Sequence, residues 1–265
     1  MTPPPLYKEL SLLLPTSGST GSSKLVRHSY KNVEANARNV SLLFGLDKHE
    51  RALAALPIYY RETGGSGPGD GGTGMLTGKS LTDGKFWTFM KEHRATSFTG
   101  VPYSFEVLQK LRFFRMDLPH LQLITQGGGK MDEKLFRTCA DYAEKNGKKF
   151  IATYGQTEGT ARMAYLPAHL ASSKICSIGR AIPNGELSLV DEQGKLILEK
   201  EATGQLVYKG PNVTLGYAFS ADDLIRGDEN KGVLFTGDLA RRDADGCYYI
   251  IGRIGRFLKL FGLRV

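Results

Sequence analysis

The run from Leu14 to Lys24 has the composition of a loop that binds phosphate groups. It reads L-P-T-S-G-S-T-G-S-S-K, with two glycines among hydroxyl side chains and a lysine at its end. Glycines let backbone N–H groups approach a ligand closely, hydroxyls donate to phosphate oxygens, and an ammonium group neutralises their charge. The ordinary P-loop has four residues between its glycines, whereas this run has two. The run therefore predicts either an unusual polyphosphate-binding loop or, taken alone, a plain flexible loop.

A second run, Y-G-Q-T-E-G-T from Tyr154 to Thr160, places an aromatic ring, a hydroxyl group and a carboxylate after an apolar segment. Tyr154 could stack on a nucleobase, and Glu158 could hold a Mg²⁺ ion that bridges phosphates. The alternative is a turn at the end of a strand, in which Thr157 caps a short helix. The run by itself leaves both interpretations open.

Two further runs near the C-terminal end are weaker signals. In F-T-G-D, Phe235 to Asp238, a carboxylate is expected to follow a tight turn, where it could accept both hydroxyl groups of a ribose. The run G-R-I-G-R-F-L-K-L-F-G-L-R-V, Gly252 to Val265, carries arginines that could equally be surface cations. Neither run identifies a function alone.

Strands and helices alternate through the first 174 residues, which predicts an α/β fold with a mainly parallel sheet and flanking helices. Apolar spacing predicts helices over residues 29–44, 83–93, 104–112 and 132–145, and strands over residues 12–14, 96–101, 121–125 and 150–154. In the first helix, Val33, Ala37 and Val40 form the expected buried face, and Asn36 and Asn39 lie off it. Glycine-bearing loops follow predicted strands at residues 18, 127 and 155, and ligands bind beyond the carboxyl ends of strands in such sheets.

From residue 175 the pattern changes to short alternating segments separated by turns, which predicts a smaller antiparallel β sheet or barrel. The expected strands cover residues 186–191, 195–198, 204–209, 233–236 and 248–251. We therefore expect an α/β nucleotide-binding core over residues 1–174 and a small β subdomain over residues 175–252.

The segment from Gly64 to Gly74 contains seven glycines in eleven residues and nothing that could form a core. Its composition predicts a flexible linker over residues 61–78; the glycine-rich part would span about 18 Å as a random coil. We expect this linker to be engineered or to replace a deleted segment. A natural glycine-rich loop is the alternative.

The composition is that of an ordinary globular protein of 265 residues, 41% hydrophobic and 23% charged. A net charge of +8 suits an anionic ligand such as a nucleotide, although the basic residues form no long run. The three cysteines have neither a disulfide framework nor zinc spacing, which favours a reducing cytoplasm. No segment has the length of a signal-peptide core or a membrane span, so we expect no membrane partner. A basic nucleic-acid binder is an alternative that no known DNA or RNA motif supports.

Taken together and in this order, the four runs resemble the motifs of the adenylate-forming superfamily. That family includes acyl-CoA synthetases, adenylation domains of peptide synthetases and luciferase-like ligases. The triple glycine Gly127–Gly129 is similar to the family's adenine-side loop. The resemblance covers nearly all of the chain except residues 1–10 and the glycine-rich segment. One departure is Ser23, which stands where the family usually has a proline and predicts a less rigid phosphate loop.

The resemblance implies that ATP, with Mg²⁺, reacts with a carboxylic acid to give acyl-AMP and pyrophosphate. CoA or a carrier-bound phosphopantetheine would then accept the acyl group in the full-length parent enzyme. The phosphate contacts implied in this way are Thr16, Ser17, Gly18, Ser19, Thr20, Gly21 and Lys24. The adenine and ribose contacts implied are Gly128, Gly129, Tyr154, Gly155, Asp238 and Arg253.

The resemblance also implies which residues act on the reacting phosphate. Thr157 would touch the α-phosphate, Glu158 would be the Mg²⁺ ligand, and Lys24 would neutralise phosphate charge. Tyr103, in the V-P-Y-S-F segment, would either line the acyl pocket or belong to the core.

Three departures from the family concern whole segments. Family members have a large segment before the phosphate loop, an aromatic-rich stretch after the region of residues 56–60, and a small C-terminal domain. That domain carries a lysine that contacts the α-phosphate, and losing one such cation can slow the reaction about a hundred- to a thousandfold. The resemblance implies that residues 253–265 are a hinge and the start of the missing C-terminal domain, and Gly255 there stands where many members have an acidic residue. We therefore expect a truncated core with weak adenylation activity, and the alternative is a non-catalytic ATP-binding fragment.

Overall fold

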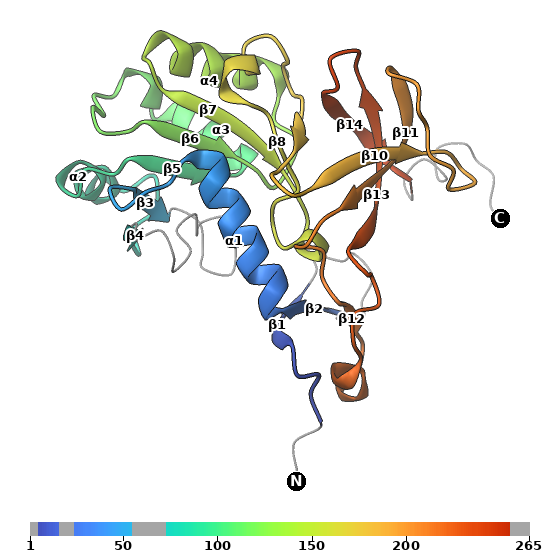
Figure 1. Cartoon of the computed structure of the whole chain (residues 1–265). Coiled ribbons are helices and arrows are strands. Elements are labelled where there is room, and N and C mark those ends of the chain that lie inside the picture. The colour runs from blue at the N-terminus through green and yellow to red at the C-terminus, as the bar shows by residue number, and fades with distance from the viewer. Residues whose placement is uncertain (1–4, 16–23, 55–72, 255–265) are drawn as a thin grey trace.

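The computed structural model describes residues 5–15, 24–54 and 73–254, and its largest layer is a seven-stranded sheet (Figure 1). The strand order is β4-β3-β5-β6-β7-β8-β9. The strands are β3 (Arg51–Ala54), β4 (Thr73–Leu76), β5 (Ser97–Gly100), β6 (Leu123–Gln126), β7 (Lys149–Tyr154), β8 (Ala164–Tyr165) and β9 (Arg180–Ala181). Strands β4, β3, β5, β6 and β7 run parallel. Strands β8 and β9 extend the sheet in antiparallel orientation. The predicted α/β class with a mainly parallel sheet is confirmed.

Helices cover both faces of this sheet, because alternate residues of its central strands are apolar on both sides. The helices are α1 (Tyr30–Phe44), α2 (Gly84–Glu92), α3 (Pro102–Lys110) and α4 (Glu133–Lys145), each within two residues of its predicted range. Ile124 and Phe150 face the core formed with α2, α3 and α4, whereas Leu123 and Ile151 pack against α1. Among the described helices, none combines the length and the hydrophobicity that a membrane span needs.

The buried face of α1 differs from the prediction. Asn36 and Asn39, expected to lie off the core, are 9% and 2% exposed. Asn36 donates to the carbonyl oxygen of Arg162 at 3.1 Å, and Asn39 accepts from the side-chain amide of Asn184 at 2.8 Å. The prediction was wrong because apolar spacing cannot reveal hydrogen-bond partners that come from distant loops.

Asn32 lies on the same face and has two roles. It completes a capping box with Ser29, and its amide donates to the carbonyl oxygens of Pro211 at 3.0 Å and Val213 at 2.7 Å. Asn32→Leu should therefore lower the free energy of unfolding by about 1–3 kcal/mol, because buried carbonyls lose their donor. Urea denaturation measures this, and the exposed neighbour Lys31→Leu should change it by only about 0.5 kcal/mol. Equal losses in both variants would contradict the role of the amide.

A four-stranded antiparallel sheet holds a second core. Its order is β10-β11-β13-β14, and its strands are β10 (Glu186–Val190), β11 (Ala202–Lys209), β13 (Val233–Arg242) and β14 (Tyr248–Arg253). Leu189, Leu206, Tyr208 and Ala240 pack in its core and are fully buried. The predicted smaller antiparallel sheet is confirmed.

The strand expected over residues 195–198 does not form. From this segment Leu196 makes an isolated bridge to Val190, and the side chains of Leu196 and Leu198 are 51% and 80% exposed. β10 is the edge strand of the sheet, and beside its open edge the segment makes two backbone hydrogen bonds, from Ile197 N–H to the Leu189 carbonyl oxygen and from Asp191 N–H to the Lys195 carbonyl oxygen, which are too few to add a further strand. Alternating apolar residues alone therefore overpredicted this strand.

A three-stranded antiparallel sheet joins the first described strands to the region around residue 217. Its order is β1-β2-β12, with β1 (Leu10–Pro15), β2 (Leu25–Ser29) and β12 (Gly216–Ala218). β1 contains the strand predicted over residues 12–14, but it is only half-buried. Because β9 and β12 pair outside the four-stranded sheet, the segment 175–252 contributes strands to all three sheets. The division expected at residue 174 stays a proposal.

Strand β4 lies in the segment predicted to be a flexible linker over residues 61–78. It pairs in parallel with β3, with Met75 opposite Leu53, and Met75 is buried in the main core. The linker prediction is therefore wrong for residues 73–76, because this stretch pairs with β3 at the edge of the sheet and packs Met75 into the core. The rest of the glycine-rich segment, up to residue 72, lies outside the described residues.

Candidate nucleotide site

Three segments that carry predicted site residues lie at the carboxyl ends of the neighbouring parallel strands β5, β6 and β7, which Figure 1 labels. Tyr103 follows β5, Gly128 and Gly129 follow β6, and Tyr154 ends β7. Lys24 immediately precedes β2. Residues 16–23 lie outside the described ranges, so the phosphate contacts expected there stay predictions: Thr16, Ser17, Gly18, Ser19, Thr20 and Gly21.

The loop after β7 folds back tightly on itself. A Cβ atom at Gly155 would lie 1.8 Å from the carbonyl oxygen of Ala161, so the backbone approach requires glycine. A 3₁₀ turn, η3 (Thr157–Gly159), then carries the hydroxyl and the carboxylate of the motif. Gln156 occupies the cap position of this turn, which excludes the capping role considered for Thr157.

A hydrogen-bonded chain joins Tyr154 to the four-stranded sheet. The Tyr154 phenol donates to Oδ2 of Asp238 at 2.6 Å, and Nε of Arg253 donates to Oδ1 at 3.0 Å. Burial, and then the Asp238 carboxylate, raises the pKa of Tyr154, so the phenol stays a neutral donor. Each carboxylate oxygen retains a further acceptor position, which leaves Asp238 able to accept from a diol. The structure thus brings together three of the residues predicted for adenine and ribose.

Asp238 does not follow a tight turn, as the sequence predicted, but lies within β13. The pairing of β11 with β13 shifts register between Gln205 and Val207, and Gly237 has a φ of 72°. This is a β-bulge, which needs glycine at a left-handed position and redirects the next side chain. The bulge therefore aims Asp238 at the end of β7.

A second cluster joins Lys24 to Glu158 through Tyr217, which the sequence analysis did not single out. The Tyr217 phenol donates to Oε1 of Glu158 at 2.8 Å, and Nζ of Lys24 lies 4.0 Å from the ring centroid. Burial, and then the hydrogen bond to Glu158, raises the pKa of Tyr217. Tyr217 lies on the three-residue strand β12, 59 positions from Glu158, and so short a strand leaves no periodic signal in the sequence.

The Glu158 carboxylate fits a Mg²⁺ ion that arrives with a polyphosphate. Oε1 accepts from Tyr217, and among the described residues no hydrogen-bond donor reaches Oε2. The described ranges also contain no group of three or more His, Cys, Asp or Glu residues that could hold a metal alone. Mg²⁺ usually keeps several waters and takes one or two carboxylates together with substrate phosphates. The donor set therefore suits a shared metal rather than a protein-only metal site.

Tyr103 and the glycines after β6 lie at the rim of the same edge. The Tyr103 side chain, in the first turn of α3, is 70% exposed, which excludes the core alternative. A Cβ atom at Gly129 would lie 3.4 Å from Cγ of Pro102, so this loop packs against the start of α3. Gly128 has a φ of 77°, a conformation that favours glycine.

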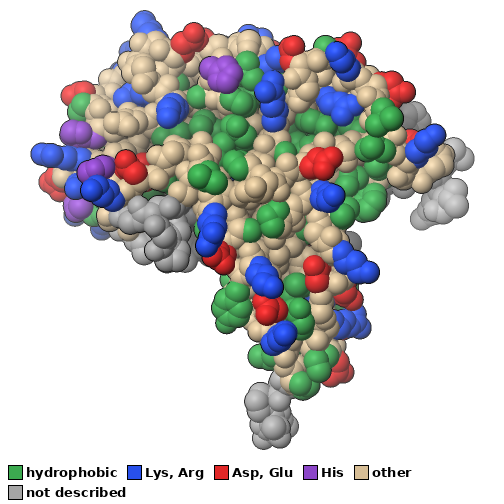
Figure 2. Space-filling model, in the orientation of Figure 1, with side chains coloured by type: hydrophobic (Ala, Val, Ile, Leu, Met, Phe, Trp, Pro, Cys, Tyr) green, Lys and Arg blue, Asp and Glu red, His purple; other side chains and the backbone are tan. Residues whose placement is uncertain are grey.

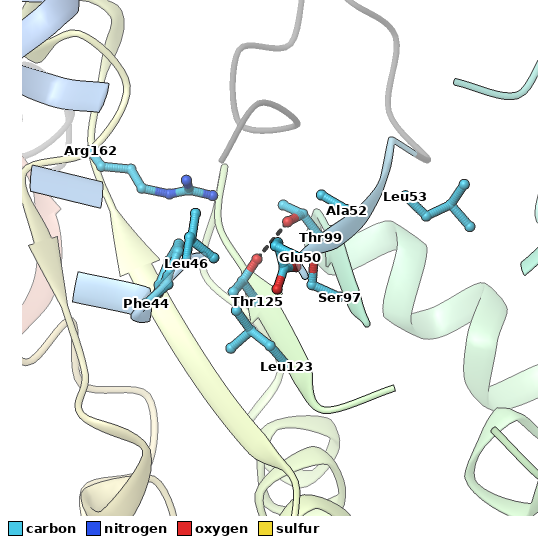
Figure 3. Close-up of a pocket in the computed structure, with 10 residues that line it drawn as sticks. All are labelled: Phe44, Leu46, Glu50, Ala52, Leu53, Ser97, Thr99, Leu123, Thr125 and Arg162. Carbon is cyan, nitrogen blue, oxygen red and sulfur yellow. Dashed lines mark hydrogen bonds between the residues drawn. The ribbon is translucent and has the colours of Figure 1, made fainter. Parts of the chain in front are cut away.

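A small pocket lies on the α1 face of the sheet (Figure 3). Its volume is about 20 Å³, room for roughly one water molecule. The hydroxyl groups of Thr99 and Thr125 meet there at 2.7 Å, beside Leu123 and Phe44. None of the predicted site residues lines it, so this pocket is separate from the candidate nucleotide site.

These features define an α/β protein whose candidate ligand edge lies beyond the carboxyl ends of its parallel strands. Residues 2–218 match the model of the AMP-binding enzyme family, and the chain belongs to that family. The resemblance to adenylate-forming enzymes is confirmed.

Known proteins that resemble this chain are acid–CoA ligases and related domains. The 2-succinylbenzoate–CoA ligase of Bacillus cereus (strain AH820) is 30% identical over 257 residues, which cover 93% of this chain and 50% of that protein. The chain therefore spans about half the length of the curated relatives it matches.

Two solved structures share the fold. One is O-succinylbenzoate coenzyme A synthetase from Bacillus subtilis in complex with ATP and magnesium ion, with a TM-score of 0.77, 24% identity, and coverage of 92% of this chain and 50% of that chain. The other is the inhibitor-bound N-terminal domain of FACL13 from Mycobacterium tuberculosis, with a TM-score of 0.77, 22% identity, and coverage of 94% and 63%. At these identities the likeness shows the fold alone.

Proposed function

We propose that the chain is the nucleotide-binding core of an AMP-forming acid ligase, which binds ATP with Mg²⁺ and adenylates a carboxylic acid. The observation that carries the proposal is the convergence of two clusters on one loop. Tyr154, at the start of that loop, donates to Asp238, and Glu158, four residues later, accepts from Tyr217, whose ring lies beside the Lys24 ammonium group. The Lys24 ammonium group, the Glu158 carboxylate and the Asp238 carboxylate thus lie at one edge of the parallel sheet.

The proposed reaction needs charge neutralisation and alignment more than acid–base chemistry. A carboxylate oxygen of the acid forms a bond to the α-phosphorus, the bond from that phosphorus to the bridging oxygen breaks, and pyrophosphate leaves. Lys24 would neutralise charge on the β- and γ-phosphates, and Thr157 would donate to the α-phosphate. Mg²⁺, when bound at Glu158, would neutralise further phosphate charge.

The nucleoside would lie at the other cluster. Asp238, held by two donors, would accept the ribose hydroxyls with Arg253 beside it. The Tyr154 ring and the backbone of Gly128 and Gly129 would border the adenine. Tyr103, at the exposed start of α3, would contribute to the acyl site.

A second candidate is an ATP-binding fragment without turnover. The chain spans about half the length of its curated relatives, so contacts that they make through their remaining half are not among those described above. This candidate shares every nucleotide contact with the first and differs only in chemistry. A nucleic-acid binder is less well supported, since Lys and Arg side chains are interspersed with acidic ones on the face in Figure 2.

Pyrophosphate release separates the two candidates. The chain is incubated with ATP, Mg²⁺ and a panel of carboxylic acids that includes 2-succinylbenzoate. We expect acid-dependent release, and a loss of about a hundredfold or more in Lys24→Ala and in Glu158→Ala, because each removes a fixed charge that faces the phosphates. Lys31→Ala, an exposed lysine of α1, is the matched control and should leave the rate unchanged.

The outcomes have distinct meanings. Nucleotide binding without acid-dependent release would support the fragment without turnover. Release that persists in Lys24→Ala and Glu158→Ala would contradict the roles proposed for those residues. A chain that binds no ATP would contradict both candidates.

A further inference from the structure

We propose that Tyr217 is a positioning residue that sets the places of the phosphate-loop lysine and the metal-binding carboxylate. The inference rests on the proposed function, from which the roles of Lys24 and Glu158 come. Tyr217 contacts the two groups with different parts of its side chain. Its hydroxyl lies 2.8 Å from Oε1 of Glu158, and its ring centroid lies 4.0 Å from Nζ of Lys24. One neutral side chain therefore bridges a cation and an anion.

The bridging position has an electrostatic consequence. In the described part of the chain, Lys24 and Glu158 form no ion pair within 4.0 Å. The Lys24 ammonium group instead contacts the Tyr217 ring, and the Glu158 carboxylate accepts a hydrogen bond from the Tyr217 hydroxyl. A direct ion pair would neutralise both groups before a ligand arrived and would place a cation where a metal ion must bind. Tyr217 instead orients the carboxylate through Oε1 and leaves Oε2 for a metal.

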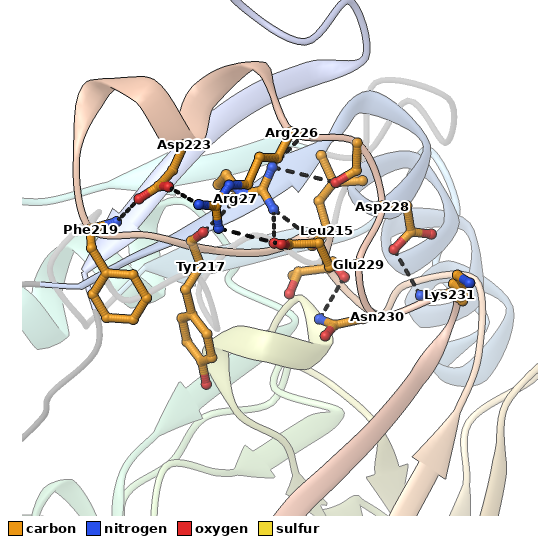
Figure 4. Close-up of polar contacts among 12 residues, drawn as sticks. Arg27, Leu215, Tyr217, Phe219, Asp223, Arg226, Asp228, Glu229, Asn230 and Lys231 are labelled. Carbon is orange, nitrogen blue, oxygen red and sulfur yellow. Dashed lines mark hydrogen bonds and ion pairs between the residues drawn. The ribbon is translucent and has the colours of Figure 1, made fainter.

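The backbone of Tyr217 is held in place by neighbouring strands and by a buried arginine. In the pairing of β12 with β2, Tyr217 lies opposite Val26, so Lys24, two residues earlier on the same face, is its diagonal neighbour. Nε of the fully buried Arg27 donates to the Tyr217 carbonyl oxygen at 3.0 Å. Figure 4 shows the phenol hydroxyl pointing away from the Arg27 cluster. The ring therefore projects from a fixed point toward η3.

Tyr217→Phe tests this inference, because it removes the hydroxyl and keeps the ring over Lys24. Binding of a fluorescent ATP analogue is measured in EDTA and across a Mg²⁺ titration. We expect the Mg²⁺ concentration at half-maximal enhancement of binding to rise about tenfold, as when a group that orients a metal ligand is lost. The affinity in EDTA should stay at the wild-type value, because the lysine contact remains. If Tyr217 had only a structural role, Tyr217→Phe would change the Mg²⁺ midpoint and the affinity in EDTA together.

One control is another tyrosine that donates to a carboxylate, and the other is Tyr217→Phe combined with Glu158→Gln. Tyr249 donates to Asp243 at 3.1 Å, away from the candidate site, so Tyr249→Phe should leave both readouts unchanged. In a Glu158→Gln background, Tyr217→Phe should add no further rise in the Mg²⁺ midpoint, since the two groups act through one bond. Circular dichroism confirms that each variant is folded before binding is compared.

An unchanged Mg²⁺ midpoint in Tyr217→Phe would overturn the inference while the proposed function stands. A lowered midpoint would also overturn it, because the hydroxyl would then compete with the metal. A wild-type chain that binds no nucleotide, with or without Mg²⁺, would contradict the proposed function and this inference with it.

Discussion

Replacing Arg27 by methionine should lower the free energy of unfolding by about 3–5 kcal/mol, measured by urea denaturation. Arg27 is fully buried on β2, and its guanidinium donates to the carbonyl oxygens of Tyr217 at 3.0 Å and Leu215 at 3.3 Å (Figure 4). It also donates to the carbonyl oxygen of Arg226 and pairs with Glu229. Methionine fills much of the volume but donates nothing, so buried carbonyls beside β12 lose their partners.

An exposed arginine gives the matched control. Arg137 forms an ion pair with Glu133 at 3.0 Å on the surface of α4, and Arg137→Met should cost at most about 1 kcal/mol. Similar losses in the two variants would mean that the buried guanidinium contacts contribute little. Because Arg27 also anchors Tyr217, Arg27→Met that still folds should show a raised Mg²⁺ midpoint in nucleotide binding.

Gly155→Ala should destabilise the chain by about 3 kcal/mol or more and weaken nucleotide binding. The added Cβ atom would lie 1.8 Å from the carbonyl oxygen of Ala161 and 3.0 Å from Cα of Arg162. Both neighbours are backbone atoms, which cannot rotate away, so the loop after β7 must shift. That loop carries Glu158, and its displacement would separate the carboxylate from Tyr217. Urea denaturation and binding of a fluorescent ATP analogue measure the two effects.

Gly84→Ala is the control for this substitution. No atom lies within 4 Å of the Cβ position at Gly84, the first residue of α2, so stability should stay the same or rise by up to about 1 kcal/mol. A Gly155→Ala chain with wild-type stability and affinity would show that the loop can relax, and the tight turn would then not position Glu158.

Local periodicity and motif order were enough to predict much of this protein. The four α-helices, the central strands of the parallel sheet and the change to antiparallel pairing follow from residues close in sequence, whose spacing sets which face is apolar. The order of four short runs was enough to indicate the family, although residues 16–23 of the first run lie outside the described part of the chain.

Contacts between distant segments could not be predicted in the same way. The bond from Tyr154 to Asp238 spans 84 positions, and the one from Tyr217 to Glu158 spans 59. Neither separation carries a periodic signal, because the pairs meet only when β13 and β12 join their sheets. The buried asparagines of α1 have the same origin, since their partners lie on loops far along the chain.

The sequence by itself therefore determined the α/β class, the helices and the chemistry available at each motif. The tertiary structure alone decided which motifs lie close together, that Tyr217 bonds to Glu158, and that residues 73–76 form a strand. The physical reason is that helices and turns depend on neighbours within a few residues, whereas strand pairing and buried hydrogen bonds depend on partners that only the folded chain brings together.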